Sequence, residues 1–261
     1  MNSYNPSNIF RLIQAGSDHL KWVTVIGAGR LGSNVAMLLH QKGLNQTLID
    51  DDWVSEQNIQ SGHMMPYGCD DIGKFKVDAL REKMIKARIF PDVKTYRCHI
   101  TTRMNPNQLD SLLGESVLVL WAIDSHEGLR VLESKMLSMM KMRIHIFAAM
   151  HGKTGGGHVA IWIPSLTPCV KHSIGLEAFS QIVQSRAEAS GIVNSDIRIV
   201  TESTAKVIFS ILKKRHGLIS DHFDLAGGNY MHIEKLGNSD IYRKFWIKPQ
   251  GDPNCQLCVD R

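Results

Sequence analysis

The chain has 261 residues, of which 43% are hydrophobic, and a formal net charge of +5 at pH 7. This length and hydrophobic content allow one large α/β domain with a small appendage. Basic residues are scattered apart from a short run at Lys213 to Arg215, which argues against a nucleic-acid-binding stripe; the mild positive charge instead suits an anionic nucleotide.

Residues 1–21 form an N-terminal segment that we expect to be helical. Its sequence, MNSYNPSNIFRLIQAG and onward, lacks the basic-then-apolar pattern of a secretory signal. The longest apolar runs, near Ser116 to Ile123 and Val159 to Pro164, fall far short of the ~20 residues that cross a bilayer. We therefore expect a cytoplasmic protein without a membrane partner, whose five cysteines are thiols or metal ligands rather than disulfides.

Strand-like runs alternate with helix-like stretches after residue 22. We expect strands at Val23–Ile26, Thr47–Asp50, Val93–His99, Val117–Ala122 and Ile144–Ala148, and helices at 31–42, 75–88, 106–113 and 127–141. This alternation favours an α/β fold with a doubly wound, Rossmann-like, mostly parallel sheet. We assign residues 22–164 to this nucleotide-binding core.

The pattern changes from Gly155 onward. The sequence GGGHVAIWIP predicts a further strand, residues 174–190 and 200–215 predict helices, and NYMHIEKL and DIYRKFWIK predict late strands. Residues 165–261 are therefore expected to complete the same domain as a small C-terminal extension.

A nucleotide pocket is predicted where the first strand ends. The apolar run Trp22–Ile26 leads into GAGRLG, with Gly27, Gly29 and Gly32, and then into a helix-like stretch. Such a turn gathers unpaired backbone amides and the positive end of a helix at one place, with no Cβ to block a phosphate.

The acids after the second strand indicate which nucleotide is bound. Asp50 lies where a dinucleotide-binding unit carries the acid that holds the ribose hydroxyls. Asp52 and Asn58 follow in the pattern D-x-D-x-V-x-x-x-N. A hydride-transfer enzyme needs only the first acid, so the extra polar groups favour a ligand with more phosphate, and with magnesium.

These motifs together resemble those of the MoeB/ThiF/HesA family, bacterial relatives of the ubiquitin-activating enzymes. The resemblance covers about Trp22 to Cys258 and includes, in order, GAGRLG, DDDWVSEQN, DIGKFK, LVLWAIDSHEGLR, GKTGGGHVAIWIP, TPCVKH and PNCQLC. It implies adenylation of a carboxylate by ATP, typically on the C-terminal glycine of a ubiquitin-like or sulfur-carrier protein, with release of pyrophosphate. A homodimer is also implied.

The resemblance also implies roles for individual residues. Gly27, Gly29, Arg30 and Gly32 approach the nucleotide, Asp50 holds its ribose, Asp52 also contributes to nucleotide binding, and Asn58 and Lys76 lie beside the phosphates. Asp124 holds Mg²⁺, and Arg130 matches an arginine often found six residues later. The alternatives are a solvated helix residue for Lys76, a turn residue for Asn58, a helix cap for Asp124 and a surface charge for Arg130.

Two short chelating pairs predict a metal centre. Cys169-x-x-His172 and Cys255-x-x-Cys258 each allow both side chains to reach one tetrahedral ion, and four such ligands without a carboxylate suit structural Zn²⁺. The family carries four cysteines here, so His172 is a substitution that zinc tolerates. The alternative is that His172 is a surface residue and the cysteines are incidental.

The sequence departs from the family pattern at two places. The family usually has Arg-Gln shortly after the asparagine, but this chain has Ser61 and Gly62; Arg11, Arg30 and Arg130 are the candidate substitutes, Arg11 across a dimer. No cysteine lies between Ser173 and Asn254, which excludes transfer through a thioester on that segment. Cys69 and Cys98 remain; we favour structural thiols, and a role for either stays open. Two other functions stay open: a non-catalytic partner subunit and an NAD-dependent oxidoreductase.

Overall fold

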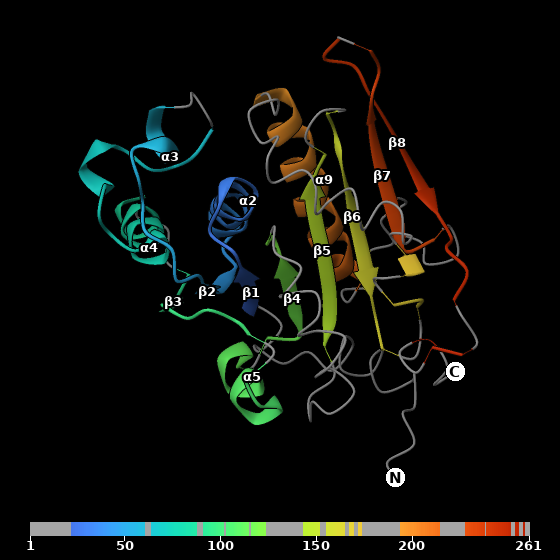
Figure 1. Ribbon diagram of the computed structural model, residues 1–261, viewed down its shortest axis with the longest axis horizontal. Helices are drawn as coiled ribbons and strands as arrows, with labels where there is room; N and C mark the ends of the chain where they lie inside the picture. The colour runs from blue at the N-terminus through green and yellow to red at the C-terminus, as the bar shows by residue number, and fades with distance from the viewer. Residues whose placement is uncertain are drawn as a thin grey trace.

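The computed structural model describes residues 22–60, 64–87, 91–101, 103–114, 116–123, 143–151, 155–164, 167–169, 172–173, 194–214, 228–237, 239–251, 254–255 and 258. Within these ranges eight strands form one sheet in the order β3-β2-β1-β4-β5-β6-β7-β8 (Figure 1). The expected N-terminal helix and the expected helices 127–141 and 174–190 lie outside the described residues.

The strands are β1 (Trp22–Ile26), β2 (Asn45–Ile49), β3 (Val93–Tyr96), β4 (Leu118–Trp121), β5 (Ile144–Met150), β6 (Gly157–Trp162), β7 (Tyr230–Lys235) and β8 (Tyr242–Ile247). The helices are α2 (Arg30–Gln41), α3 (Gln57–Gln60), α4 (Lys76–Lys86), α5 (Pro106–Leu113) and α9 (Asn194–Lys214), with a short 3₁₀ turn, η2 (Cys69–Asp71).

The sheet has a parallel half and an antiparallel half. Strand β1 pairs in parallel with β2 and β4, and these pair in parallel with β3 and β5. Strands β6, β7 and β8 then continue the sheet in antiparallel pairs. The prediction of a doubly wound, mostly parallel α/β sheet is confirmed, and the C-terminal strands extend the same sheet.

Most element boundaries differ from the expectation by one or two residues, and two differ by more. The third strand was expected to reach His99 but ends at Tyr96, because its partner β2 ends at Ile49 and leaves no strand beside the following residues. Helix α9 begins at Asn194 rather than at residue 200. Its first turn is polar, so the apolar spacing gave no sign of it.

Apolar side chains alternate between the two faces of the sheet and build two cores. Helices α2, α4 and α9 cover one face, where Leu39, Leu80 and Ile208 pack with Val25 and Leu120 of β1 and β4. The other face packs against α5 through Leu109 and Leu113 and also carries Trp121 and Trp162. Helices on both faces fix the sheet as an inner layer.

The carboxyl ends of the central parallel strands lie together. Ile26 at the end of β1 is level with Ile49 of β2 and Trp121 of β4. The chain order reverses between β1 and β4, and open α/β sheets bind their ligands in the crevice above such a reversal. No helix in the described part of the chain is long and apolar enough to span a membrane.

Candidate functional site

The glycine-rich turn connects β1 to α2. Each of its three glycines has a different structural role. Gly27 has a φ of +95°, and a Cβ there would lie 2.5 Å from the carbonyl oxygen of Ala122. A Cβ on Gly32 would lie 1.9 Å from the carbonyl oxygen of Gly27, so it permits close packing. Gly29 has an ordinary φ of −71° and nothing within 4 Å of its Cβ position. What Gly29 provides is open space before the amino end of α2, where a phosphate binds favourably.

Asp50 follows β2 and holds the glycine turn in place. Its Oδ2 accepts a hydrogen bond from the Ala28 N–H at 2.6 Å, and its Oδ1 accepts one from the Asp52 N–H at 2.8 Å. Burial raises the pKa of Asp50, and these two N–H groups oppose that rise. Each carboxylate oxygen keeps a second lone pair, which suits the expected contact with ribose hydroxyls.

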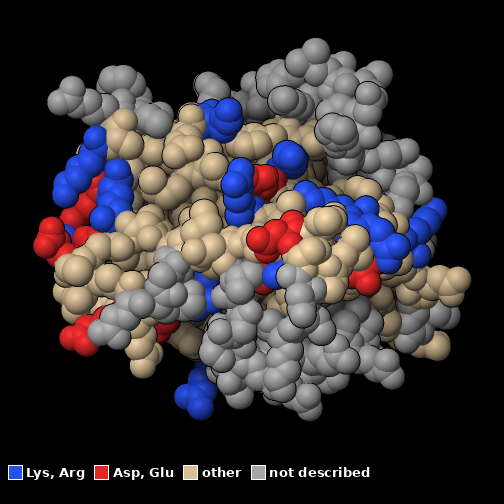
Figure 2. Space-filling model, turned by 90° about the horizontal axis from the view of Figure 1, so that it is seen from above, with Lys and Arg blue, Asp and Glu red and all other residues tan. Residues whose placement is uncertain are grey.

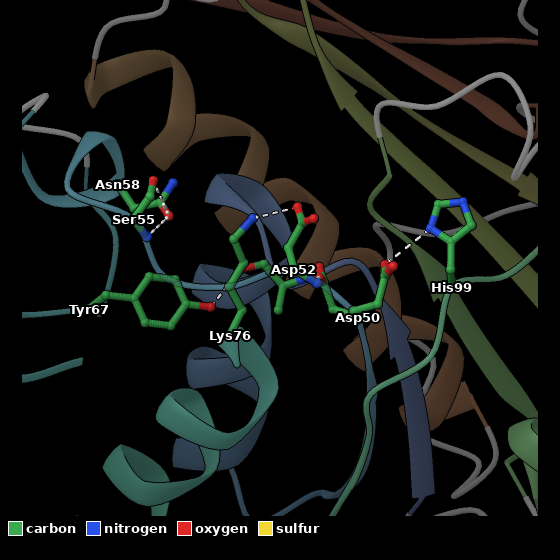
Figure 3. A network of polar contacts seen from close by, with 9 residues as sticks. Asp50, Asp52, Ser55, Asn58, Tyr67, Lys76 and His99 are labelled. Carbon is green, nitrogen blue, oxygen red and sulfur yellow. Dashed lines mark hydrogen bonds and ion pairs between the residues drawn. The ribbon is translucent and has the colours of Figure 1, made fainter. Parts of the chain in front are cut away.

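Tyr67 supports the same turn from the other side, and sequence reasoning missed it. Its hydroxyl donates to the Ala28 carbonyl at 2.6 Å, and the side chain is buried (Figure 3). Burial, together with the charge of Asp50, raises the pKa of Tyr67 far above its usual value. The phenol therefore stays a donor, and Ala28 is held through both its N–H and its C=O.

Lys76 is the first residue of α4 and is only 9% exposed. Its Nζ lies 2.8 Å from Oδ2 of Asp52, whose side chain is 70% exposed (Figure 3). The alternative that Lys76 is a solvated helix residue is therefore wrong. A buried ammonium at the positive end of a helix is unfavourable by itself, and a carboxylate or phosphate beside it offsets the cost.

Asn58 lies in a turn next to the site. Its Oδ1 accepts hydrogen bonds from the Ser55 N–H at 2.8 Å and from the Ser55 hydroxyl at 3.2 Å (Figure 3). These bonds agree with the turn-residue alternative. The amide nitrogen of Asn58 makes no hydrogen bond to any residue that the structure describes, so a ligand contact through it stays a prediction.

Arg30 begins α2 inside the glycine turn. Burial lowers the pKa of its guanidinium, and the buried Nη1 atom has no hydrogen-bond partner within the described ranges. A cation in this position, unpaired at the positive end of a helix, fits an anionic ligand. The other charged candidates, Arg11, Asp124 and Arg130, and the departures Ser61 and Gly62, lie outside the described residues.

A second polar contact joins the ends of β2 and β3. Nδ1 of His99 lies 3.1 Å from Oδ1 of Asp51, and both side chains are exposed. Cys98 next to it is half-buried, and burial raises the pKa of its thiol, with Asp51 adding to the rise. Figure 2 shows the molecule from above the view of Figure 1, with acidic and basic side chains next to one another in several groups.

A set of imidazoles lies on the antiparallel half of the sheet. Nε2 of His151 and Nδ1 of His158 are 3.0 Å apart, and the rings of Tyr230 and His232 lie beside them. Burial lowers the pKa of His158 far below its usual value, with His151 adding to this, and lowers that of His151 to about 4. These imidazoles are uncharged near neutral pH.

The four predicted metal ligands come together although the two pairs are far apart in the sequence. Cys169, His172, Cys255 and Cys258 place one ligand atom each within 4.8 Å of all the others. Sγ of Cys169 lies 3.1 Å from Nδ1 of His172 and 4.0 Å from Sγ of Cys255. The prediction that these residues form one cluster is confirmed.

The cluster fits zinc. Tetrahedral Zn²⁺ needs S···S separations of about 3.8 Å and S···N separations of about 3.6 Å, which follow from its bond lengths. The distances above lie within about half an ångström of these values. Burial raises the pKa of the Cys169 thiol. A zinc ion would bind the thiolate form. Trp162 and Tyr230 pack in the same core as Cys169, which places the cluster against the sheet.

Comparison with known proteins identifies the family of the chain and solved structures with a similar fold. Residues 13–257 match the ThiF family. No curated protein sequence matches the chain. A structure of E. coli MccB with AMPCPP and MccA is 18% identical, with a TM-score of 0.70, over 99% of this chain and 76% of that one. A structure of E. coli MccB with ATP is 18% identical, with a TM-score of 0.67, over the same shares. A structure of PaaA is also 18% identical, with a TM-score of 0.62, over 95% of this chain and 85% of that one.

Proposed function

The chain belongs to the ThiF family, and we propose that it uses ATP to adenylate a carboxylate, giving an acyl-adenylate and pyrophosphate. The carboxylate we propose is the C-terminal glycine of a ubiquitin-like or sulfur-carrier protein. One observation carries the proposal: the buried ammonium of Lys76, paired with Asp52 beside the open glycine turn. A redox coenzyme gives this pair no role.

The proposed reaction depends on positioning and charge. The substrate carboxylate is ionised at neutral pH and needs no general base. It attacks the α-phosphorus, a new P–O bond forms, and the bond to the leaving pyrophosphate breaks. Negative charge gathers on the phosphorus oxygens, where fixed cations and N–H groups stabilise it. Lys76 supplies such a cation, with Arg30 and Arg130 as further candidates.

The remaining residues bind and orient the nucleotide in this proposal. Gly29 leaves room for the phosphates, Asp50 holds the ribose, and the amide of Asn58 approaches the phosphate chain. Asp124 would hold Mg²⁺, and the carboxylates of Asp50, Asp51 and Asp52 lie within 4.8 Å of one another at the same edge. Oxygen ligands of this kind suit Mg²⁺, which when bound neutralises phosphate charge.

The solved neighbours support the proposal. Structures of E. coli MccB contain ATP, or AMPCPP together with MccA, on a fold that this chain shares. We extend from them to this chain the use of ATP and the binding of a substrate partner. We also propose a homodimer, in which Arg11 reaches the partner subunit's pocket, and a structural Zn²⁺ that takes no part in the chemistry.

Exchange of labelled pyrophosphate into ATP tests the proposal. The purified protein with a candidate carrier protein ending in Gly-Gly should catalyse exchange, and Lys76→Ala should lower the rate about 10²- to 10³-fold. Lys86→Ala, at the other end of α4, is the matched control and should leave the rate unchanged. Exchange that survives Lys76→Ala, or tight binding of NADH in place of ATP-Mg²⁺, would overturn the proposal.

Ser61 and Gly62 favour one second candidate, a non-catalytic subunit that completes the active site of another protein. The family arginine is missing there, and an incomplete set of cations would need a partner's residue. Activity that appears only after mixing with a second ThiF-family chain would support this candidate. Exchange by the purified homomeric protein would exclude it.

A further inference from the structure

A short antiparallel ladder joins the end of β2 to the start of α4, outside the main sheet. The Lys76 N–H donates to the Asp52 carbonyl at 2.9 Å, and the Val54 N–H donates to the Lys74 carbonyl at 2.8 Å. Trp53 and Phe75 are the bridge partners at its centre. This ladder brings Asp52 and Lys76 to the same place although 24 positions separate them.

The two faces of the ladder carry different chemistry. Side chains alternate along an extended segment, so neighbouring residues point to opposite sides. Asp52 and Lys76 form the ion pair described above, and Val54 on the same side is buried. Trp53 and Phe75, which alternate with these residues in the sequence, lie on the opposite side, where their rings stack with centroids 3.7 Å apart.

A cation from the residue that directly follows β3 extends the stack. The guanidinium carbon of Arg97 lies 4.6 Å from the ring centroid of Phe75, and its Nε lies 2.6 Å from Oδ2 of Asp78 on α4. Trp53 itself is 55% exposed, although most tryptophan side chains are largely buried. An exposed indole in this place contributes little to the core, so its stacking on Phe75 needs another explanation.

The start of α4 has only partial support from its own sequence. Asp78 in the first turn favours the positive end of the helix, but two other features of α4 do not. Its N-cap residue is Phe75, which has no side-chain capping hydrogen bond, and its first residue is a lysine at the positive end of the helix. Both features favour fraying of the first turn. Fraying would move the Lys76 ammonium away from the crevice.

We propose that Trp53 and Phe75 are positioning residues, whose stack fixes the ladder and thereby holds Lys76 at the phosphate site. The expected effect on the exchange rate rests on the proposed function, whereas the expected effect on the position of Lys76 does not. This role requires no contact of the stack with the nucleotide or the acyl group. It acts through the backbone of residues 52–54 and 73–76.

Three variants test this inference. Trp53→Phe keeps an aromatic ring on Phe75, Trp53→Leu removes the ring, and Ile85→Ala removes an apolar side chain of similar exposure, 53%, from α4. The first readout is independent of activity: the rate at which an amine-acylating reagent modifies Lys76, followed by peptide mass spectrometry. Trp53→Leu should raise this rate about threefold to tenfold, the range expected for loss of an aromatic pair. Trp53→Phe and Ile85→Ala should not raise it.

The second readout is pyrophosphate exchange. Trp53→Leu should lower kcat about tenfold to a hundredfold, with the KM for ATP changed less than about threefold, because a misplaced charge costs most in the transition state. Trp53→Phe should restore kcat. If the wild type shows no exchange but Lys76 labelling follows the predicted order, the proposed function fails and the positioning role stands. Equal labelling in all three variants would overturn the positioning role, even if exchange is present.

Discussion

The parallel and antiparallel halves of the sheet differ in how they hold ionisable side chains. At the ends of β1 and β2, charges are kept and paired close to solvent, as in Asp52 with Lys76. On β6 and β7, His158 and its neighbours are packed against aromatic rings and held neutral. The first arrangement keeps charge available for a ligand, whereas the second removes charge from the core. We therefore expect changes in the parallel half to alter chemistry and changes in the antiparallel half to alter stability.

Breaking the Cys/His cluster should give the largest effect, and on stability. Cys258→Ser removes one of four ligands and should lower the free energy of unfolding by several kcal/mol, a part of the about 10–16 kcal/mol that structural zinc contributes in isolated peptides. Metal analysis and denaturant unfolding with and without chelator measure this. Cys69→Ser, at an exposed thiol outside the cluster, is the control. A wild type free of zinc and unaffected by chelator would contradict the assignment.

Acid should destabilise the protein through buried histidines of β5 and β6, where the antiparallel half of the sheet begins. Burial lowers the pKa of His145 and His158 in the folded state, whereas an unfolded histidine titrates near about 6.5. The unfolded chain then binds more protons below that pH, so stability is complete above about 6.5 and falls by about 1.4 kcal/mol per pH unit for each histidine.

Denaturant unfolding between pH 8 and pH 5 measures this slope. His158→Asn should reduce the slope by about one proton. Tyr230→Phe changes a ring that touches His158 but whose pKa is raised to about 12, so it should leave the slope unchanged. Stability that is flat down to pH 5 would show that these imidazoles are not held neutral.

Removing the charge from Asp52 should sharpen the contrast between the two halves of the sheet, because it should lower the exchange rate more than the free energy of unfolding. Asp52→Asn leaves an oxygen for the Lys76 ammonium but no charge, and kcat for exchange should fall about tenfold to a hundredfold. The side chain is 70% exposed, so the free energy of unfolding should change by less than about 1 kcal/mol. Asp92→Asn, at an exposed carboxylate just before β3, is the control. If Asp52→Asn lowers the free energy of unfolding by more than it raises the activation free energy of exchange, the distinction between the two halves does not hold.

Tyr67 is the residue at which the structural role and the binding role meet. Tyr67→Phe leaves the Ala28 carbonyl without its buried donor, which should cost about 1–3 kcal/mol of stability and loosen the glycine turn. Titration with ATP-Mg²⁺ should show weaker binding, whereas Tyr96→Phe, at an exposed ring, should change neither quantity. Unchanged nucleotide affinity would limit Tyr67 to a structural role.

The sequence was informative where a local pattern has one structural cause. Apolar runs located the described strands, and the spacing of Gly27, Gly29 and Gly32 located the turn before α2. The two C-x-x-C/H pairs predicted the Cys/His cluster, because short spacing brings two ligand atoms together without any knowledge of the fold. The place of Lys76 in DIGKFK predicted a role beside the phosphates; its burial and its pairing with Asp52 are observed, and the role itself stays a prediction.

Contacts between distant segments could not be predicted in this way. Tyr67 donates to a residue 39 positions away, and nothing in its neighbours marks it as a support for Ala28. The stack of Trp53 on Phe75 depends on the ladder between two loops, and the pair of Asp51 with His99 depends on β2 and β3 ending together. Such partners become visible only when the strands are assembled.

The strand order also determines how the fold is reached. Strands β5 and β6, and likewise β7 and β8, are hairpins whose partners follow one another in the chain, whereas β1 must find β4 far downstream. Local pairing has a smaller loop-closure cost and forms faster. The hairpins should therefore gain protection first in pulse-labelling hydrogen exchange during refolding, with β1 among the last strands to be protected. The nucleotide crevice, which needs β1 and β4 side by side, is then a late product of folding, and early protection of β1 would argue against this sequence of events.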